Sequence, residues 1–146
     1  MTPELLRMLR SGERDEVTLE SVPYARFMNF SLRHAGARVL VHVGFDPRHI
    51  GAPGRYHGGV IGAALEFAAM AELMWRLLDT EAEMTTMPRP VTLTVDFLRA
   101  ARAQDLHAAA DIARTGRRMA SVRARAWQED ETRPVAEAQM HFLLRR

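Results

Sequence analysis

The segment from His57 to Phe67 holds the residues of this 146-residue chain whose types and spacing could do chemistry. A histidine and two glycines open an apolar helical pattern, and one carboxylate, Glu66, lies within it. The first N–H groups of a helix have no partner inside the helix and can bind an oxygen that carries negative charge. Gly58 and Gly59 have no Cβ, so a ligand can approach this backbone closely. The segment could therefore polarise a carbonyl group and supply a base, which are the requirements of acyl transfer.

The position of Glu66 on the helix can be judged from angles. At about 100° per residue, Glu72, Arg76 and Asp79 lie within about 60° of one another and form a polar stripe. Glu66 lies roughly 115° from the centre of that stripe, so we expect it on the apolar side of the helix. An unpaired buried carboxylate has a raised pKa, which is common among catalytic acids and bases. Pairing with a buried arginine, or capping of a neighbouring loop, is an equally good interpretation of Glu66 from the residues alone.

One long helix and about five strands would hold these groups in place. The helical pattern runs from about Gly58 to Asp79, and polar residues with two prolines connect it to the next strand over 80–90. Alternating apolar and polar residues predict strands, each with one apolar face, at 38–46, 91–97, 106–112, 120–126 and 136–144. The short connections after the helix favour antiparallel neighbours. We expect an α+β fold, with an antiparallel sheet of about five to six strands wrapped around one central helix.

The first part of the chain predicts smaller elements. Residues 1–10 form a short helix, with Thr2 as N-cap and Pro3 as first residue, appended at about 3–10 to a single domain that spans 1–146. Residues 11–22 and 46–56 read as loops. Residues 22–30 hold a turn of helix that directs Phe27, Met28 and Phe30 inward.

Composition excludes several classes of function. The chain has no cysteine, so it forms no disulfide and uses no thiol. Its basic residues are all arginines, acidic residues are interleaved with them, and the net charge is only +2, which disfavours nucleic-acid binding. No uncharged apolar run is long enough to cross a membrane, and we expect a cytoplasmic protein. The six histidines show no metal-ligand spacing, so we expect no metal site.

The His57-Gly58-Gly59 motif, followed by an apolar helix with an acidic residue nine positions after the histidine, resembles the hotdog-fold thioesterases of the phenylacetic-acid-degradation (PaaI-like) type. The flanking segments agree with that family in order and spacing over roughly residues 20–144. These segments are Val22–Arg26, Val39–Phe45, Val91–Arg99 and Gly116–Arg118.

The resemblance implies an acyl-CoA thioesterase. It assigns the polarisation of the thioester carbonyl to the backbone N–H of Gly58. Glu66 acts as general base on water, or as nucleophile that forms an anhydride with the acyl group, and the sequence does not decide between the two. His57 is kept as a catalytic candidate, although beside two glycines we expect it to fix the loop by hydrogen bonding. The CoA thioester is the substrate, and no cofactor is implied.

The resemblance also suggests how substrate is held. Gly59, Met70 and Phe97 are the candidates to contact the acyl end, and Arg99, Arg117 and Arg118 are the candidates to contact a CoA phosphate. Hotdog domains pair so that two sheets continue into one another, which implies a homodimer or homotetramer with sites at the dimer interface.

One position departs from the family. Many relatives carry Asn or Gln about six residues before the histidine, where this chain has Gly51 or Ala52. His49 and Tyr56 are the nearby polar residues that could replace the amide. The departure supports an alternative, a non-catalytic hotdog module that binds acyl-CoA or a related ligand. A hotdog dehydratase fits less well, because its Asp and His motif is not reproduced here. The acyl group cannot be read from the sequence.

Overall fold

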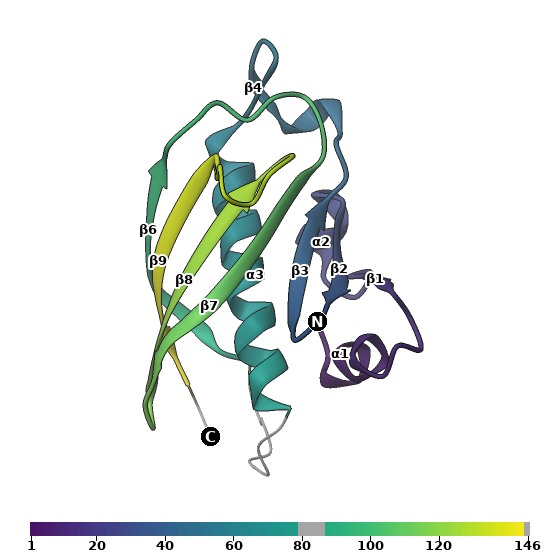
Figure 1. Cartoon of the computed structure of the whole chain (residues 1–146), viewed down its shortest axis with the longest axis vertical. Coiled ribbons are helices and arrows are strands. Elements are labelled where there is room, and N and C mark those ends of the chain that lie inside the picture. Colours follow the sequence, from purple (N-terminus) through teal and green to yellow (C-terminus); the bar gives the residue numbers. More distant parts are fainter. Residues whose placement is uncertain (79–86, 145–146) are drawn as a thin grey trace.

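In the computed structural model, which describes residues 1–78 and 87–144, a long helix lies along one face of a curved antiparallel sheet (Figure 1). The elements are α1 (Pro3–Arg10), β1 (Glu16–Thr18), α2 (Pro23–Phe27), β2 (Phe30–Ala35), β3 (Arg38–Val43), a 3-10 turn η1 (Pro47–His49), β4 (Ile50–Ala52), β5 (Arg55–Tyr56), α3 (Gly58–Leu77), β6 (Arg89–Phe97), β7 (Leu106–Thr115), β8 (Met119–Trp127) and β9 (Ala136–Leu143). The main sheet has seven strands in the order β1-β2-β3-β7-β8-β9-β6, and β4 pairs with β5 separately. The predicted α+β arrangement is confirmed. The predicted helix end at Asp79 lies outside the described residues.

Helix α3 forms from strong helix formers and is buried along most of its length. Its interior is rich in Ala and Leu, which have the best helix propensities. Side chains such as Ala64, Ala68 and Leu65 are fully buried, and the helix packs mainly over β3, β7 and β8. Full burial of one Leu side chain contributes about 1.5–3 kcal/mol. The small alanines let the sheet approach the helix axis, so α3 is held firmly in its position.

The predicted alternation is confirmed in the strands beneath α3. Val39, Val41 and Val43 of β3 are buried, and the residues between them face the other side of the sheet. Strands β8 and β9 behave in the same way, with buried positions at every second residue, including Val122, Met140 and Phe142. A strand that is apolar on one face only can be recognised locally, because successive side chains point to opposite faces.

The N-terminal part differs from the prediction. Helix α1 is capped as expected, since the Thr2 hydroxyl accepts from the Leu5 N–H at 3.4 Å. Strand β1, however, lies in the segment 11–22 that we predicted as loop, and β2 begins at Phe30, the last residue of the predicted turn of helix. Phe27 was predicted to point inward and is 57% exposed, with the Arg48 guanidinium 5.1 Å from its ring centroid. The prediction for Phe27 was wrong because a short helix such as α2 has too few residues to fix which face is covered.

Strand β6 was predicted to have one apolar face against the core, and this is wrong for most of its length. It is the edge strand of the sheet next to β9, and Val91, Leu93 and Phe97 are 58%, 41% and 58% exposed. Val95 alone of this face packs against the core. The reason is geometric: α3 covers the central strands, and the sheet extends past it at β6 (Figure 1).

Glu72 was placed on a polar stripe by its helical angle, and the structure corrects this. Its side chain is 2% exposed, and its Oε1 accepts from Arg76 Nε at 2.7 Å. Burial raises the pKa of Glu72, and the Arg76 guanidinium opposes that shift. The angle between residues on a helix is set by the sequence, but the face that meets the sheet is not.

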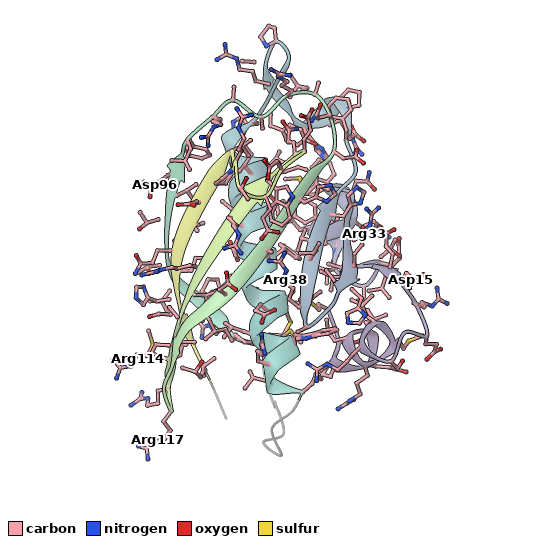
Figure 2. All side chains as sticks on the ribbon, viewed as in Figure 1. Asp15, Arg33, Arg38, Asp96, Arg114 and Arg117 are labelled. Carbon is pink, nitrogen blue, oxygen red and sulfur yellow. The ribbon has the colours of Figure 1, made fainter. Side chains whose placement is uncertain are left out.

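An ion-pair network joins three segments through Glu131. Its carboxylate accepts from Arg38 of β3 at 2.7 Å and from Arg125 of β8 at 2.8 Å, and Arg125 also donates to Asp111 of β7 at 2.9 Å. Figure 2 labels Arg38 near α3, at the middle of the molecule in that view. The hydrogen bond from Arg38, and then that from Arg125 and the charges of both guanidinium groups, lower the pKa of Glu131 from 4.5 to about 2. Glu131 therefore stays charged and holds the β8–β9 turn against the sheet.

We predict that Glu131→Gln lowers the free energy of unfolding by about 1–2 kcal/mol near neutral pH, after allowance for its partial exposure. The folded pKa lies below the ordinary value, so this stabilisation is present above pH 4.5 and is lost as pH falls toward 2. Urea unfolding of both proteins at about pH 7 and about pH 3 should show a difference that shrinks in acid. Glu20→Gln, at an exposed position, is the control, and a difference independent of pH would contradict the assignment.

Candidate functional site

The start of α3 is fixed by His57. This residue is the N-cap, and its Nδ1 accepts a hydrogen bond from the Gly59 N–H at 2.9 Å. The His57 carbonyl accepts from the Val60 N–H at 3.0 Å. No acceptor for the Gly58 N–H occurs in the described part of the chain. The expected loop-fixing role of His57 is confirmed, and one N–H at the helix start remains available to an outside acceptor.

The loop before the helix is tightly packed at Gly51, one of the two positions that could match the amide of the family. Gly51 lies so close to His57 that an added Cβ would stand 2.8 Å from the His57 Cα. Real Cβ atoms do not approach backbone that closely, so a side chain at this position requires the loop to move. The packing of His57 against this loop is therefore compatible with glycine at position 51 and not with Asn or Gln.

A cavity of about 450 Å³ opens at the start of α3. Its walls include Gly58, Phe97 and Arg99, three residues that the sequence analysis singled out, together with Arg55 and Tyr56 from β5. The Phe97 ring lies over Gly58, where an added Cβ would stand 3.1 Å from Cζ. Because Gly58 has no side chain, its N–H is accessible from a space with both apolar and cationic walls.

Tyr56 and His49 were named as possible replacements for the missing amide; Tyr56 lines the cavity, and the buried His49 ring lies beside the Tyr56 ring. His49 is 1% exposed and Tyr56 is 7% exposed, with ring centroids 5.6 Å apart. The Tyr56 hydroxyl is buried without a hydrogen-bond partner in the described residues. Burial, and then the charge of Asp105, raises the pKa of Tyr56 to about 12, and burial lowers the pKa of His49. Both groups are therefore neutral near pH 7.

Glu66 lies in the first half of α3. It is half-buried, and no hydrogen bond or ion pair to it occurs within residues 1–78 and 87–144. Burial is the cause that raises its pKa above 4.5. The structure thus favours the unpaired carboxylate over the two alternatives, an arginine pair or a loop cap. Met70, one turn further along, is half-buried beside the core, and Gly59 is exposed.

The remaining predicted residues, Arg117 and Arg118, are not brought to this site within one chain. They lie in the turn between β7 and β8, and Figure 2 shows Arg117 at the opposite end of the molecule from the β4–β5 end, where α3 starts. Within one protomer they do not border the cavity at Gly58, and their contact with a CoA phosphate stays a prediction. The turn motif at Gly116 matched the family, but spacing along the chain does not show at which end of the sheet a hairpin lies.

The described residues contain neither a candidate membrane-spanning helix nor a candidate metal site. No helix in residues 1–78 or 87–144 combines the length and apolar character needed to cross a bilayer. Over the same residues, no three side chains of His, Asp or Glu are placed to hold a metal ion together. Arg55 was absent from the predicted site, and Tyr56 was considered only as a replacement for the amide, because both precede the motif in a segment that we interpreted only as loop. The aromatic residue directly before His57 was the available signal.

Comparison with known proteins places this geometry in a family. A family model described as the acyl-CoA thioesterase N-terminal domain matches residues 47–143. The chain shares 32% identity with a Chromobacterium violaceum protein of known structure, over 98% of both chains, with a TM-score of 0.73. No curated protein matches it.

Two more distant structures have the same fold. A Ralstonia eutropha protein, described as a candidate thioesterase related to phenylacetic acid degradation, is 21% identical over 95% of this chain and 98% of its own, with a TM-score of 0.72. A Bacillus halodurans protein in complex with CoA is 16% identical over 99% of this chain and 89% of its own, with a TM-score of 0.73. The resemblance read from the sequence is confirmed. The chain belongs to the acyl-CoA thioesterase family within the hotdog-fold thioesterase superfamily.

Proposed function

We propose that this protein hydrolyses acyl-CoA thioesters at the start of α3. The observation that carries the proposal is the free Gly58 N–H, which borders a cavity of about 450 Å³ on the same helix as the unpaired Glu66. An N–H directed at the thioester oxygen stabilises the negative charge that develops there in the transition state. The Glu66 carboxylate then activates water as a general base or attacks the carbonyl carbon itself. The family match and the CoA-bound relative support this choice of substrate.

A complete site requires two copies of the chain. Gly58 and Glu66 are eight residues apart, which corresponds to about 12 Å along the helix axis. A reacting carbonyl must lie within about 3–3.5 Å of its base or nucleophile while its oxygen contacts the N–H. A Glu side chain that leans toward the helix start shortens this span but does not close it. We therefore propose that Gly58 of one protomer and Glu66 of a second copy act on the same thioester.

The exposed edge of the sheet supplies the surface for that second copy. Strand β6 presents unpaired backbone groups and the exposed apolar side chains of Val91, Leu93 and Phe97. Such an edge pairs readily with another strand, and a two-fold axis lets β6 pair with itself. We propose a homodimer, alone or as half of a homotetramer, in which two sheets continue through β6. Phe97 then lies close to both the interface and the cavity.

The alternative is a non-catalytic module that binds acyl-CoA or a similar ligand. The observation that favours it is Gly51, where the packing of His57 leaves no space for the amide that orients water or substrate in many relatives. It predicts saturable CoA binding without thiol release.

We predict that Glu66→Gln lowers kcat for thiol release from acyl-CoA by about 100-fold or more, because the variant has neither a base nor a nucleophile. The melting temperature should stay equal or rise slightly, since the substitution removes a half-buried charge that has no partner. Thiol release is followed with a thiol-reactive dye over a panel of acyl-CoAs, with Glu4→Gln on α1 as the control. A folded Glu66→Gln protein with wild-type kcat would exclude this role.

The pH dependence of the wild type gives a second test of Glu66. A base or nucleophile must be deprotonated, so kcat should rise with pH through the pKa of Glu66 in the complex. Burial raises that pKa, so the midpoint should lie above 4.5. A rate that is constant with pH, or that falls over this range, would contradict the mechanism.

We predict that Leu93→Arg converts the oligomer to a monomer and abolishes turnover, because a charge on β6 opposes pairing of the edge strands. Light scattering after gel filtration measures the mass. Met119→Arg on β8 is the control, since Met119 is also 41% exposed but does not lie on the edge strand. An oligomer that survives Leu93→Arg would exclude β6 as the interface.

A further inference from the structure

A second cavity, of about 180 Å³, adjoins the cavity at the start of α3. The two share Arg99 and Ala100 in their walls, so they lie side by side at the loop that follows β6. The second cavity is open to solvent and lies between this loop and the β8–β9 turn. It carries three arginines, Arg99, Arg102 and Arg133, and we call it the arginine cavity.

Two of these arginines are free to bind an outside anion. The guanidinium groups of Arg102 and Arg133 form no hydrogen bond or ion pair in the described part of the chain. Arg99 donates from Nη1 to the Pro134 carbonyl at 2.7 Å, which fixes the direction of its side chain. The arginine cavity therefore contains two guanidinium groups, those of Arg102 and Arg133, without a hydrogen bond or ion pair within the described residues.

The two acidic residues of the arginine cavity, Glu129 and Asp130, accept hydrogen bonds from neighbouring residues. Asp130 accepts from the Thr132 hydroxyl at 2.7 Å and from the Thr132 N–H at 2.9 Å, and these bonds lower the pKa of Asp130, the hydroxyl bond most. Glu129 accepts from Gln104 Nε2 at 3.4 Å. Within the described residues neither carboxylate forms a close ion pair with Arg102 or Arg133, although the charge of Arg133 also contributes to the lowered pKa of Asp130.

The backbone of the arginine cavity is held in place before any ligand arrives. Gln128 accepts from the Arg102 N–H at 2.8 Å and donates to the Arg102 carbonyl at 2.9 Å, which fastens the loop to the end of β8. The Tyr56 N–H donates to the Ala101 carbonyl at 3.0 Å, and the Leu98 N–H donates to the Val135 carbonyl at 2.9 Å. A loop fixed on both sides loses little further entropy when a ligand binds.

We propose that the arginine cavity binds the phosphate groups of the CoA nucleotide while the thioester lies beside Gly58. This inference rests on the proposed function and names the part of the chain that recognises the nucleotide. Guanidinium groups form paired, charge-assisted hydrogen bonds with phosphate oxygens. Arg99 and Ala100 border both cavities, so the two lie close enough together for one CoA thioester to occupy both. The turn that carries Arg117 lies at the opposite end of the folded protomer from the start of α3 (Figure 2).

The kinetic test compares substrates with and without the nucleotide. In the double variant Arg102→Gln and Arg133→Gln, KM for acyl-CoA should rise about tenfold, because two charge-assisted contacts are lost. KM for the matching acyl-pantetheine, which has no nucleotide phosphate, should not change, and kcat should not change for either substrate. The control carries the same change of charge at the exposed Arg7 and Arg14 on the N-terminal segment. An unchanged KM for acyl-CoA would overturn the inference.

A binding test separates this inference from the proposed hydrolysis. Calorimetric titration with CoA, dephospho-CoA and pantetheine needs no turnover. We expect affinity to fall in that order for the wild type, and the double variant to bind CoA as weakly as the wild type binds pantetheine. A protein that binds in this way but releases no thiol would keep the phosphate site and exclude hydrolysis. If Arg117→Gln with Arg118→Gln weakens CoA binding and the Arg102 and Arg133 variant does not, the phosphates bind at the β7–β8 turn and the inference is wrong.

Discussion

The hydrogen bond from the Gly59 N–H to Nδ1 of His57 determines the geometry of the helix start, and the site extends outward from it. By taking up the second N–H of α3, the histidine leaves that of Gly58 as the donor that faces the cavity. The bond also brings the imidazole so close that an added Cβ on Gly59 would stand 2.9 Å from Nδ1. Glycine in a helix costs about 1 kcal/mol relative to alanine, so the two glycines weaken the first turn of α3. Burial of the alanines and leucines further along the helix offsets this cost.

How far the sequence predicted the structure depends on how local each signal is. The alternation in β3, β8 and β9 is contained in the strands themselves, and the apolar run of α3 is contained in the helix, so the α+β arrangement followed. Strand β1 has three residues and exists because it pairs with β2, which no local pattern shows. The exposure of β6 and the burial of Glu72 depend on where α3 crosses the sheet. That position is set by packing between segments far apart in the sequence.

The residues of the candidate site also differ in whether a local sequence signal could identify them. Gly58, His57 and Glu66 belong to one continuous motif, so the free N–H and the fixing of the loop by His57 could be expected from their order. An ion pair or a loop cap for Glu66 was an equally good interpretation until the structure showed no partner in the described residues. The arginines could not be ranked from the sequence, because each stands alone in a turn or at a strand end. In the folded protomer Arg99 lies at the cavity beside Gly58, and Arg117 lies at the opposite end of the molecule. Which arginines lie together depends on hairpin geometry, not on spacing.

The absence of lysine has a consequence for a protein that handles activated acyl groups. A lysine beside a bound thioester carries a primary amine, which becomes a nucleophile when it loses its proton and can take the acyl group permanently. Arginine stays protonated at any physiological pH and has no such lone pair to offer. The cations of the arginine cavity and of the helix-start cavity are all arginines. A surface built in this way can attract an anionic thioester without becoming acylated on its side chains.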